Sequence, residues 1–387
     1  MTMFSRNDRT ILGRWFWTVD RTLLALLVLL IAVGLVAVAA ASPAAAQRLS
    51  GANFRLDDFF FLKRQAMWVA VGLPVMLGIS MLPHATVRRL AVIGTGIGIA
   101  TLAALPLIGT EINGAVRWIV AGGVQVQPSE FLKPVFIVAT AWILATRFED
   151  DKLPAFAISG VSLAVIAALL VIQPDYGQTM LIGAIWGLQA FLAGLSMGAI
   201  VMVIGAAVGV LSLGYFISPH VSSRFDRFLT GDGDTYQIDR ALDAIRAGGF
   251  FGAGPGEGQA KFSLPEPQTD YIFAVIGEEF GSVACLAVAV LFLALVIRVG
   301  TQLFEEEDPF ITLAASGLAA QIGLQAFINM GVATSLLPSK GMTLPFISHG
   351  GSSFLALCLG AGMLLALTRR SRFMKTPSYG TRTGLPA

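Results

Sequence analysis

The sequence predicts an all-α integral membrane protein with about ten transmembrane helices and a large extracytoplasmic loop between the seventh and the eighth. Of its 387 residues, 55% are hydrophobic and 13% are charged, whereas soluble proteins average about 25% charged residues. Apolar runs close to the ~20 residues that cross a bilayer recur along the whole chain. Charged residues collect in the connections between these runs. Together these observations place the chain among polytopic membrane proteins.

Ten apolar runs are candidate spans, and we expect each to form a helix. They cover residues 22–42, 65–82, 87–108, 131–147, 155–173, 179–195, 197–217, 271–298, 309–333 and 347–368. The first run precedes "ASPAAAQ", which resembles a signal-peptidase site. Its length of about 20 residues exceeds the 7 to 15 of a signal core, so we expect a transmembrane helix there.

An even number of spans places both termini on one side of the membrane. Basic residues are frequent in the N-terminal segment 1–21 and in the tail 369–387. By the positive-inside rule, both segments are expected in the cytoplasm, with 22–368 as the membrane domain. The connections at 43–64, 109–130, 174–178, 218–270 and 334–346 then lie outside.

The outer connection 218–270 is the longest, and it contains "YQIDRALDAIRAGGFFG". Ile238, Leu242 and Ile245 recur there at helical spacing, and Gly248 and Gly249 follow as a stop signal. We therefore expect a short amphipathic helix, of the kind that can lie in the headgroup plane.

Composition also excludes several classes of function. A net charge of +2 without one basic patch gives no reason to expect a nucleic-acid partner. Cys285 and Cys358 both lie in apolar runs, which favours neither a disulfide framework nor a metal site. The glycine-rich "GAGPGEG" at 252–258 lacks the Lys and Ser or Thr of a phosphate-binding loop. It is open to interpretation as a hinge or as a backbone surface for an anionic substrate.

Four polar segments fall on the predicted outer side, which is where a cavity between helices would need them. They read "NGAVRWIVAGGVQVQPSEFLKP" (113–134), "QPDYG" (173–177), "LPEPQTDYIFAVIGEEFG" (264–281) and "LLPSKGMTLPFISHGGSS" (336–353). The candidate substrate-binding residues in them are Arg117, Glu130, Lys133, Asp175, Lys340 and Ser352.

Each of these residues also has a structural interpretation. Arg117 beside Trp118 is typical of an interfacial anchor. Ser129 is a good N-cap for the helix that carries Glu130, but a lysine in the first turn opposes the helix dipole, so Lys133 is not explained in this way.

The remaining candidates have equally plain alternatives. Asp175, between Pro174 and Gly177, suits a turn. Lys340 suits a loop, and the "GGSS" that contains Ser352 suits a close helix crossing.

Asp270 is the candidate catalytic residue. One interpretation makes Asp270 or Thr269 the N-cap of the next helix. The other makes Asp270 a general base at the outer mouth, with Glu278 about 12 Å deeper along the helix as a structural or pKa-tuning acid. Glu278 and Glu279 point about 100° apart on a helix, so we expect only one of them to face the polar interior.

The four segments together resemble the SEDS family of bacterial cell-wall proteins (shape, elongation, division and sporulation). The resemblance covers nearly the whole chain and rests on "NGAVRWI", "QPSE", "QPDYG", "LPEPQTDYIFAVIGEEFG" and "LPSKGMTLPFISHGGSS". It implies a ten-helix fold that polymerises glycan strands from lipid II on the outer face of the plasma membrane. It also implies that Asp270 is the essential aspartate and that Arg117, Lys133 and Asp175 line the polar cavity.

The chain departs from the family pattern at two places. His349 stands where the family usually has tyrosine, and it would keep a polar contact while adding pH sensitivity. Glu257 stands near a position that is usually serine.

The segment "KGMTLP" resembles the division branch of the family more than the elongation branch. That resemblance implies partners, namely a class B penicillin-binding protein and other membrane proteins of the division complex, and enrichment at the septum. No cofactor is certain, although a divalent cation, Mg²⁺ or Mn²⁺, would help a pyrophosphate leave. Two alternatives stay open: a flippase for the lipid-linked precursor, and a noncatalytic scaffold of the division complex.

Overall fold

The structure, a computed structural model, describes residues 10–51, 54–112, 114–150, 152–202, 205, 209, 236–338 and 341–369. Its α-helices are α1 (Ile11–Thr18), α2 (Arg21–Leu49), α3 (Phe60–Ser80), α4 (His84–Ile108), α5 (Pro128–Ala145), α6 (Ala155–Ile172), α7 (Tyr176–Leu192), α10 (Tyr236–Gly248), α11 (Ile272–Leu303), α12 (Pro309–Ala333) and α13 (Gly351–Leu367). Among the described residues there are also two 3-10 helices, η1 (Thr146–Phe148) and η2 (Ala260–Ser263), and residues 197–202 are helical. The strands are β1 (Thr110–Ile112), β2 (Ala115–Ala121) and β3 (Val124–Val126).

The helical membrane fold is confirmed. Nine of the ten predicted spans form α-helices in the described residues, and most of the tenth, 197–217, lies outside them. In the part of the chain that the structure describes, seven helices are long and apolar enough to cross a membrane by length and composition: α2, α3, α4, α5 with η1, α6, α11 and α12. The apolar helix α13 is shorter, at 17 residues.

Helix α2 continues beyond its predicted end at residue 42. Pro43 lies inside it, and Ala44, Ala45 and Ala46 are buried. Alanine is the best helix former, and here these residues also pack against the bundle, so the helix ends only at Leu49. Its 29 residues span about 43 Å, which is longer than the ~30 Å hydrocarbon core.

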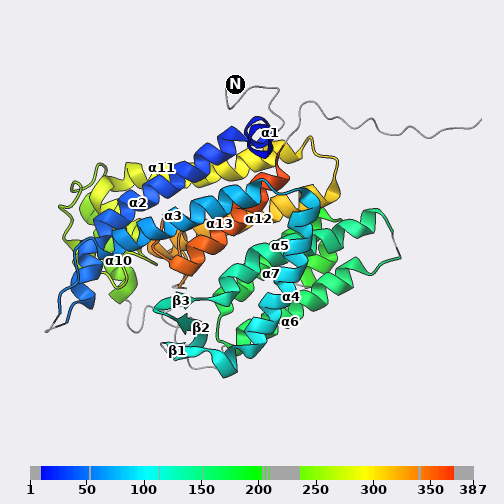
Figure 1. Ribbon diagram of the computed structural model, residues 1–387. Helices are drawn as coiled ribbons and strands as arrows, with labels where there is room; N and C mark the ends of the chain where they lie inside the picture. Colours follow the sequence, from blue (N-terminus) through cyan, green and yellow to red (C-terminus); the bar gives the residue numbers. More distant parts are fainter. Residues whose placement is uncertain are drawn as a thin grey trace, which may run out of the picture.

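The helices form one bundle in which α5, α12 and α13 are central (Figure 1). Most residues of α5 are buried, and α5 packs against α4, α12 and α13. Helix α13 also packs along α3, and α11 along α2 and α12. The central helices therefore have neighbours on several sides, whereas α4 and α6 keep broad exposed apolar faces, as lipid-facing helices do.

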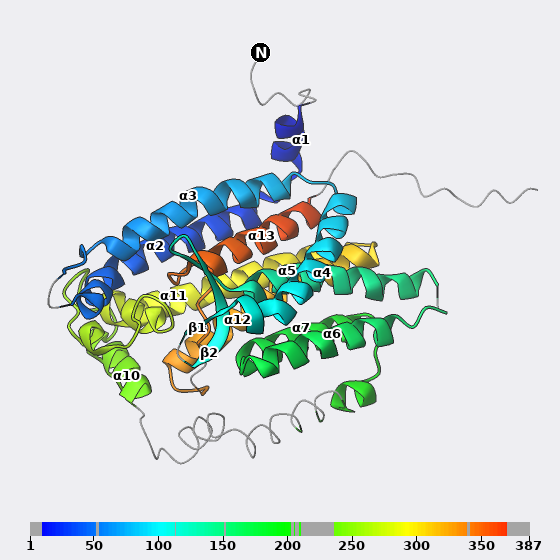
Figure 2. The same cartoon turned by 60° about the horizontal axis from the view of Figure 1, so that its bottom comes forward.

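The two described ends of the chain meet at one end of the bundle. Trp15 of α1 donates a hydrogen bond from Nε1 to Ser80 Oγ (2.8 Å), and Arg369 donates one from Nη2 to the carbonyl of Leu82 (2.7 Å). Ser80 is the last residue of α3, and Leu82 lies in the connection from α3 to α4. The strands and α10 lie at the opposite end (Figures 1 and 2), which we call the sheet end. This arrangement agrees with an even number of crossings.

The connection 109–130 contains a small sheet that the sequence analysis did not predict. Strand β2 pairs antiparallel with β1 on one side and with β3 on the other. The β2–β3 turn consists of Gly122 and Gly123, both with positive φ. A Gly-Gly pair between two runs rich in β-branched residues is a hairpin signal, so the feature was readable in "VRWIVAGGVQV".

Helix α11 is broken at Gly281, whose φ of 83° and ψ of 175° are not helical. The loop 249–254 fills the break. On the N-terminal side of the break, the backbone carbonyls of Glu278 and Glu279 accept hydrogen bonds from the N–H groups of Ala253 (2.8 Å) and Gly254 (3.1 Å). On the C-terminal side of the break, the N–H groups of Ser282 and Val283 donate to the carbonyls of Gly249 (2.9 Å) and Phe250 (3.3 Å). The loop thereby satisfies backbone groups that a helix end would leave unpaired.

The predicted amphipathic helix is confirmed as α10, but it packs on protein. Its fully buried residues are Ala241, Ala244 and Gly248, a stripe at helical spacing, while Ile238, Leu242 and Ile245 are half-buried. A Cβ on Gly248 would lie 2.0 Å from the carbonyl oxygen of Gly277. Small residues thus allow α10 to approach the first half of α11 closely.

We predict that Gly252→Ala destabilises the protein far more than Gly256→Ala. Both glycines have positive φ (85° and 89°), so each alanine pays about 1–2 kcal/mol of backbone strain. Only at Gly252 would the Cβ also meet backbone, 2.2 Å from the Glu279 carbonyl oxygen; at Gly256 nothing lies within 4 Å. Thermal unfolding of the purified variants in detergent measures the difference, and equal melting temperatures would contradict this account of the loop.

Candidate functional site

Glu130, in the first turn of α5, is the centre of a buried polar network near the sheet end. Its Oε1 accepts hydrogen bonds from Lys133 Nζ (2.9 Å) and Gln178 Nε2 (2.6 Å). Its Oε2 accepts from Ser353 Oγ (3.1 Å). Since these donors lie on α5, α7 and α13, one carboxylate joins three helices.

Lys133 carries the network to α12. Its side chain is fully buried, and Nζ also donates to Gln325 Oε1 (3.4 Å). Gln325 Nε2 donates to the carbonyl of Thr343 (3.0 Å), whose Oγ1 lies 3.0 Å from Ser353 Oγ. The contacts therefore form a closed ring that runs from Glu130 through Lys133, Gln325, Thr343 and Ser353 back to Glu130. The ammonium group of Lys133 faces protein atoms in this arrangement, and its predicted contact with substrate stays a prediction.

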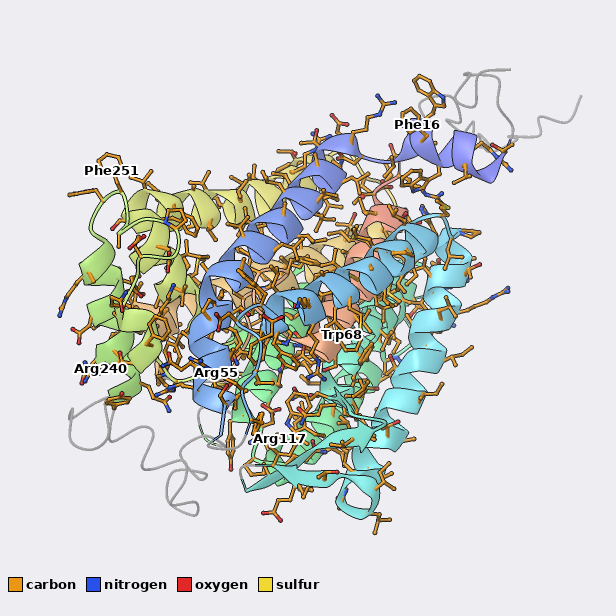
Figure 3. The ribbon with its side chains drawn as sticks, turned by 60° about the vertical axis from the view of Figure 1, so that its left-hand side comes forward. Phe16, Arg55, Trp68, Arg117, Arg240 and Phe251 are labelled. Atoms are coloured by element: carbon orange, nitrogen blue, oxygen red, sulfur yellow. The ribbon has the colours of Figure 1, made fainter. Side chains whose placement is uncertain are left out.

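Arg117, on β2, is bound to the connection between α6 and α7. Its Nε donates to the carbonyl of Gln173 (2.7 Å) and its Nη2 to that of Pro174 (2.5 Å). Figure 3 shows the residue at the sheet end, far from α1. Arg117 thus holds the sheet against this connection, which is more specific than the interfacial anchoring considered from the sequence.

Asp175 is buried as the N-cap of α7. Its Oδ1 accepts from the N–H of Gln178 (3.3 Å), and Gln127 Nε2 donates to its Oδ2 (3.4 Å). Burial raises the pKa of this carboxyl, and the neighbouring Arg117 guanidinium opposes the rise. Because Gln178 contacts both Asp175 and Glu130, Asp175 is connected to the network around Lys133.

One sequence interpretation is wrong at this site, and two predicted substrate-binding residues, Ser352 and Lys340, stay predictions. Ser129 is not the N-cap of α5: Gln127 occupies that position, and Pro128 is the first helical residue, where its missing N–H costs nothing. The hydroxyl that reaches Glu130 belongs to Ser353, while the predicted Ser352 is buried beside it in the first turn of α13. Lys340 lies outside the described residues.

Asp270 lies in the turn before α11 and is half-buried. The N-cap interpretation is wrong, because the N-cap position belongs to Tyr271 and carries no side-chain cap. Asn329 of α12 donates to the carbonyl of Asp270 (3.0 Å) and to that of Met342 (2.7 Å). A Cβ on Gly341 would lie 3.3 Å from Asp270 Oδ2. The carboxylate therefore lies against the connection between α12 and α13.

Two further hydrogen bonds join the turn 266–270 to that connection. Ser348 Oγ donates to the carbonyl of Thr269 (2.7 Å), and the N–H of His349 donates to the carbonyl of Gln268 (2.8 Å). Together with Asn329, they fix the backbone of three consecutive residues ending at Asp270. The third and fourth polar segments thus meet, as the sequence analysis predicted, although through backbone groups.

His349 faces α3. Its Nδ1 lies 3.1 Å from Gln65 Oε1, and its ring packs edge-on against Phe61. Burial, together with the smaller effect of the Arg64 charge, lowers the pKa of His349 from 6.5 to about 4. A histidine with such a pKa is neutral at physiological pH, so the expected pH sensitivity does not extend to that range.

Glu278 and Glu279 are both buried and both bind the segment 256–261. The Glu278 carboxylate accepts from the N–H groups of Ala260 (2.6 Å) and Lys261 (2.7 Å) at the start of η2. The Glu279 carboxylate accepts from Gly256 N–H and forms a buried ion pair with Lys261 Nζ. The expectation that only one glutamate faces the polar interior is therefore wrong, because the break at Gly281 gives each its own partner in the folded-back loop.

Sequence reasoning missed the amides and one lysine that connect these groups: Gln178, Gln325, Asn329 and Lys261. Gln325 and Asn329 are four residues apart in an apolar span, and this spacing places them on one helix face. Polar side chains within spans are costly unless they have partners. That rule, applied to amides as well as charges, would have found them.

A protein-held metal ion does not fit the described residues, among which no group of three or more His, Cys, Asp or Glu side chains is arranged to hold one. The carboxylates of Glu130 and Asp175 already accept hydrogen bonds from protein donors. The expected help from Mg²⁺ or Mn²⁺ stays a prediction, and no step below depends on it.

We predict that Lys133→Ala lowers stability by about 3–5 kcal/mol, because it leaves the buried Glu130 carboxylate without its cation. The double variant Lys133→Met/Glu130→Gln should recover much of this loss, since a neutral pair needs no counter-charge and glutamine keeps an acceptor for Gln178. Thermal unfolding of the wild-type protein, Lys133→Met, Glu130→Gln and the double variant completes the cycle. Purely additive losses would show that the two residues are not coupled.

A second prediction concerns His349 and acid. Its folded-state pKa is below the ordinary value, so its stabilising contribution is fully present above about pH 6.5 and is lost as the pH falls towards 4. His349→Gln should flatten the pH dependence of the melting temperature between pH 6.5 and 4. Between pH 7 and 8 the substitution should leave this pH dependence unchanged. An unaltered acid slope in the variant would contradict this assignment.

Comparison with known proteins identifies the family of this chain. A family model described as a cell cycle protein, FtsW/RodA/SpoVE, matches residues 20–373. A probable peptidoglycan glycosyltransferase FtsW from Caulobacter vibrioides is 43% identical, over 95% of this chain and 93% of its own. One from Halorhodospira halophila is 36% identical, over 91% and 89%.

Two solved structures share the fold. One, reported for the structural coordination of polymerization and crosslinking by a peptidoglycan synthase complex, superposes with a TM-score of 0.74 at 25% identity, over 90% of this chain and 97% of that chain. The rod shape determining protein RodA of Thermus thermophilus gives 0.67 at 26% identity, over 90% and 96%. The chain therefore belongs to the FtsW/RodA/SpoVE family of cell cycle proteins, the SEDS family that its four polar segments predicted.

Proposed function

We propose that this protein is a peptidoglycan glycosyltransferase that polymerises lipid II into glycan strands during septal wall synthesis. The observation that carries the proposal is the placement of Asp270. Its side chain is half-buried, and its own carbonyl is bound by Asn329 of α12, while the two residues before it are bound by the α12–α13 connection at the sheet end. The relatives named as probable peptidoglycan glycosyltransferases support the reaction class.

In this reaction the acceptor is a hydroxyl of N-acetylglucosamine, and a lipid pyrophosphate leaves the anomeric carbon of N-acetylmuramic acid. Asp270 takes the hydroxyl proton as the new C–O bond forms, and the electron pair of the breaking C–O bond departs with the pyrophosphate. A single displacement of this kind needs no enzyme nucleophile, so the anomeric configuration inverts. Partial burial of Asp270 suits a general base, because its environment excludes part of the competing water.

In this mechanism, the guanidinium of Arg117 at the sheet end stabilises the negative charge that develops on the leaving pyrophosphate. Lys133, buried against Glu130, acts through the network by holding α5, α7, α12 and α13 in place. The proposed substrate-binding set also includes Glu130, Asp175, Lys340 and Ser352. Of these, Glu130 and Asp175 are buried and act by holding neighbouring segments in place.

Charge placement favours a polymerase over a flippase. A flippase needs a polar route to both membrane faces. Helices α5, α12 and α13 are described along their whole length, and their only Asp, Glu, Lys or Arg residues are Glu130 and Lys133 in the first two turns of α5. A noncatalytic scaffold, the other alternative, gives the fixed carboxylate of Asp270 no chemical role.

We further propose that the sheet end faces the outside, that both termini are cytoplasmic, and that the protein works at the septum. Its proposed partners are a class B penicillin-binding protein and other membrane proteins of the division complex. Support comes from the division-type names of the relatives and from the similar structure reported for a synthase complex that coordinates polymerization and crosslinking.

The direct experiment gives the purified protein, with its transpeptidase partner, labelled lipid II while penicillin blocks crosslinking. Glycan strands in a gel assay support the proposal. Translocation of lipid II across vesicles without strand formation would favour the flippase. Neither activity, with stimulation of a separate polymerase, would favour the scaffold.

We predict that Asp270→Asn lowers the polymerisation rate by about 10² to 10⁴, because the amide cannot accept the hydroxyl proton, while lipid II binding persists. The matched control is Glu266→Gln, which neutralises an exposed carboxyl in the same turn and keeps an acceptor for the Thr269 hydroxyl. A folded Asp270→Asn protein with normal turnover would contradict the assignment.

A further inference from the structure

The first half of α11, residues 272–280, is a short helical stub that ends at the break. Asp270 lies two residues before it, and Gly281 separates it from the longer second half. No helical hydrogen-bond pattern can run unbroken through a residue with φ 83° and ψ 175°. The position of the stub, and of the turn that precedes it, therefore depends on contacts with other segments.

At its C-terminal end, the stub is held by the glutamates and the lysine described above. Glu278, Glu279 and Lys261 are between 0% and 1% exposed. The Glu278 carboxylate binds two backbone N–H groups of η2, and Glu279 pairs with the Lys261 ammonium. Gly258 fits closely over these carboxylates, since its Cβ would lie 2.7 Å from Glu278 Cδ.

At its N-terminal end, the stub is held through the turn 266–270 by Asn329, Ser348 and His349. The two restraints lie at opposite ends of a nine-residue helical segment, about 13 Å apart at 1.5 Å per residue. A shift at either end moves the whole segment, because a helix this short transmits displacement along its axis.

We propose that Lys261, through its buried pair with Glu279, is a positioning residue that sets the place of Asp270 in the active site. The inference rests on the proposed role of Asp270 as the base. Lys261 itself is too deeply buried to bind substrate in this arrangement. Its removal leaves the Glu279 carboxylate buried without a cation, which drives the η2 segment and the stub apart.

The first arm of the test measures catalysis with the full-length protein and its partner. Lys261→Met should lower kcat per folded molecule by about 10- to 100-fold, as a displacement near 1 Å at a reacting group does, and should change KM for lipid II little. Lys261→Met/Glu279→Gln should restore most of kcat, since glutamine still accepts from Gly256 N–H and the pair is neutral. The control is Lys63→Met, which removes an exposed lysine paired with Asp57 and should have no effect.

The second arm measures position without catalysis. In the variant Asp270→Cys/Gly341→Cys, the two thiols lie within reach, given the 3.3 Å between Asp270 Oδ2 and a Cβ on Gly341. The rate of oxidant-driven disulfide formation in the folded fraction should fall by roughly an order of magnitude when Lys261→Met is added, because proximity sets the effective concentration of the thiols. It should recover when Glu279→Gln is added as well.

Three results would overturn the proposal: an unchanged crosslinking rate, a higher KM with kcat preserved, or a double variant as impaired as the single one. A lower melting temperature with normal kcat per folded molecule would show a purely structural role. If the wild-type protein makes no glycan strands, the proposed function fails while the crosslinking arm still decides whether Lys261 positions residue 270.

Discussion

The buried carboxylate of Glu130 is the interaction on which the centre of the structure depends. A charge in an apolar bundle is costly unless cations and hydrogen-bond donors surround it. Glu130 obtains them from Lys133, Gln178 and Ser353, so the requirement to satisfy one carboxylate fixes α5, α7 and α13 relative to each other. Through Lys133 and Gln325 the same requirement extends to α12 and to the connection that carries Thr343.

The same connection explains where Asp270 lies. Asn329 is one helical turn after Gln325 on α12, and it binds both Met342 and the carbonyl of Asp270. A continuous set of hydrogen bonds therefore leads from the Glu130 network to the proposed base, without placing the base inside the network. The side chain of Asp270 is half-buried, whereas the buried carboxylates of Glu130, Glu278 and Glu279 hold the structure.

The sequence was sufficient to locate nine of the ten predicted spans and for the meeting of the four polar segments, because both follow from where apolar and polar residues lie along the chain. It was not sufficient for contacts that depend on register. Ser353 and Ser352 are equivalent by composition, and only the helix phase of α13 decides which one reaches Glu130. The break at Gly281 is invisible in an apolar run, since a single glycine is tolerated in a helix, yet it decides the partners of Glu278 and Glu279. The Gly122–Gly123 pair is a hairpin signal that the sequence analysis missed, because it considered the charged residues of this connection and not its turn residues.

The most direct measurement of the central claim is an experimental structure of the Asp270→Asn protein with its partner and lipid II bound. The account predicts that the sugar hydroxyl that attacks lies within about 2.6–3.2 Å of residue 270, with the pyrophosphate of the second lipid II towards Arg117 at the sheet end. A lipid II headgroup bound away from residue 270, with both hydroxyl and pyrophosphate contacting other segments, would contradict it.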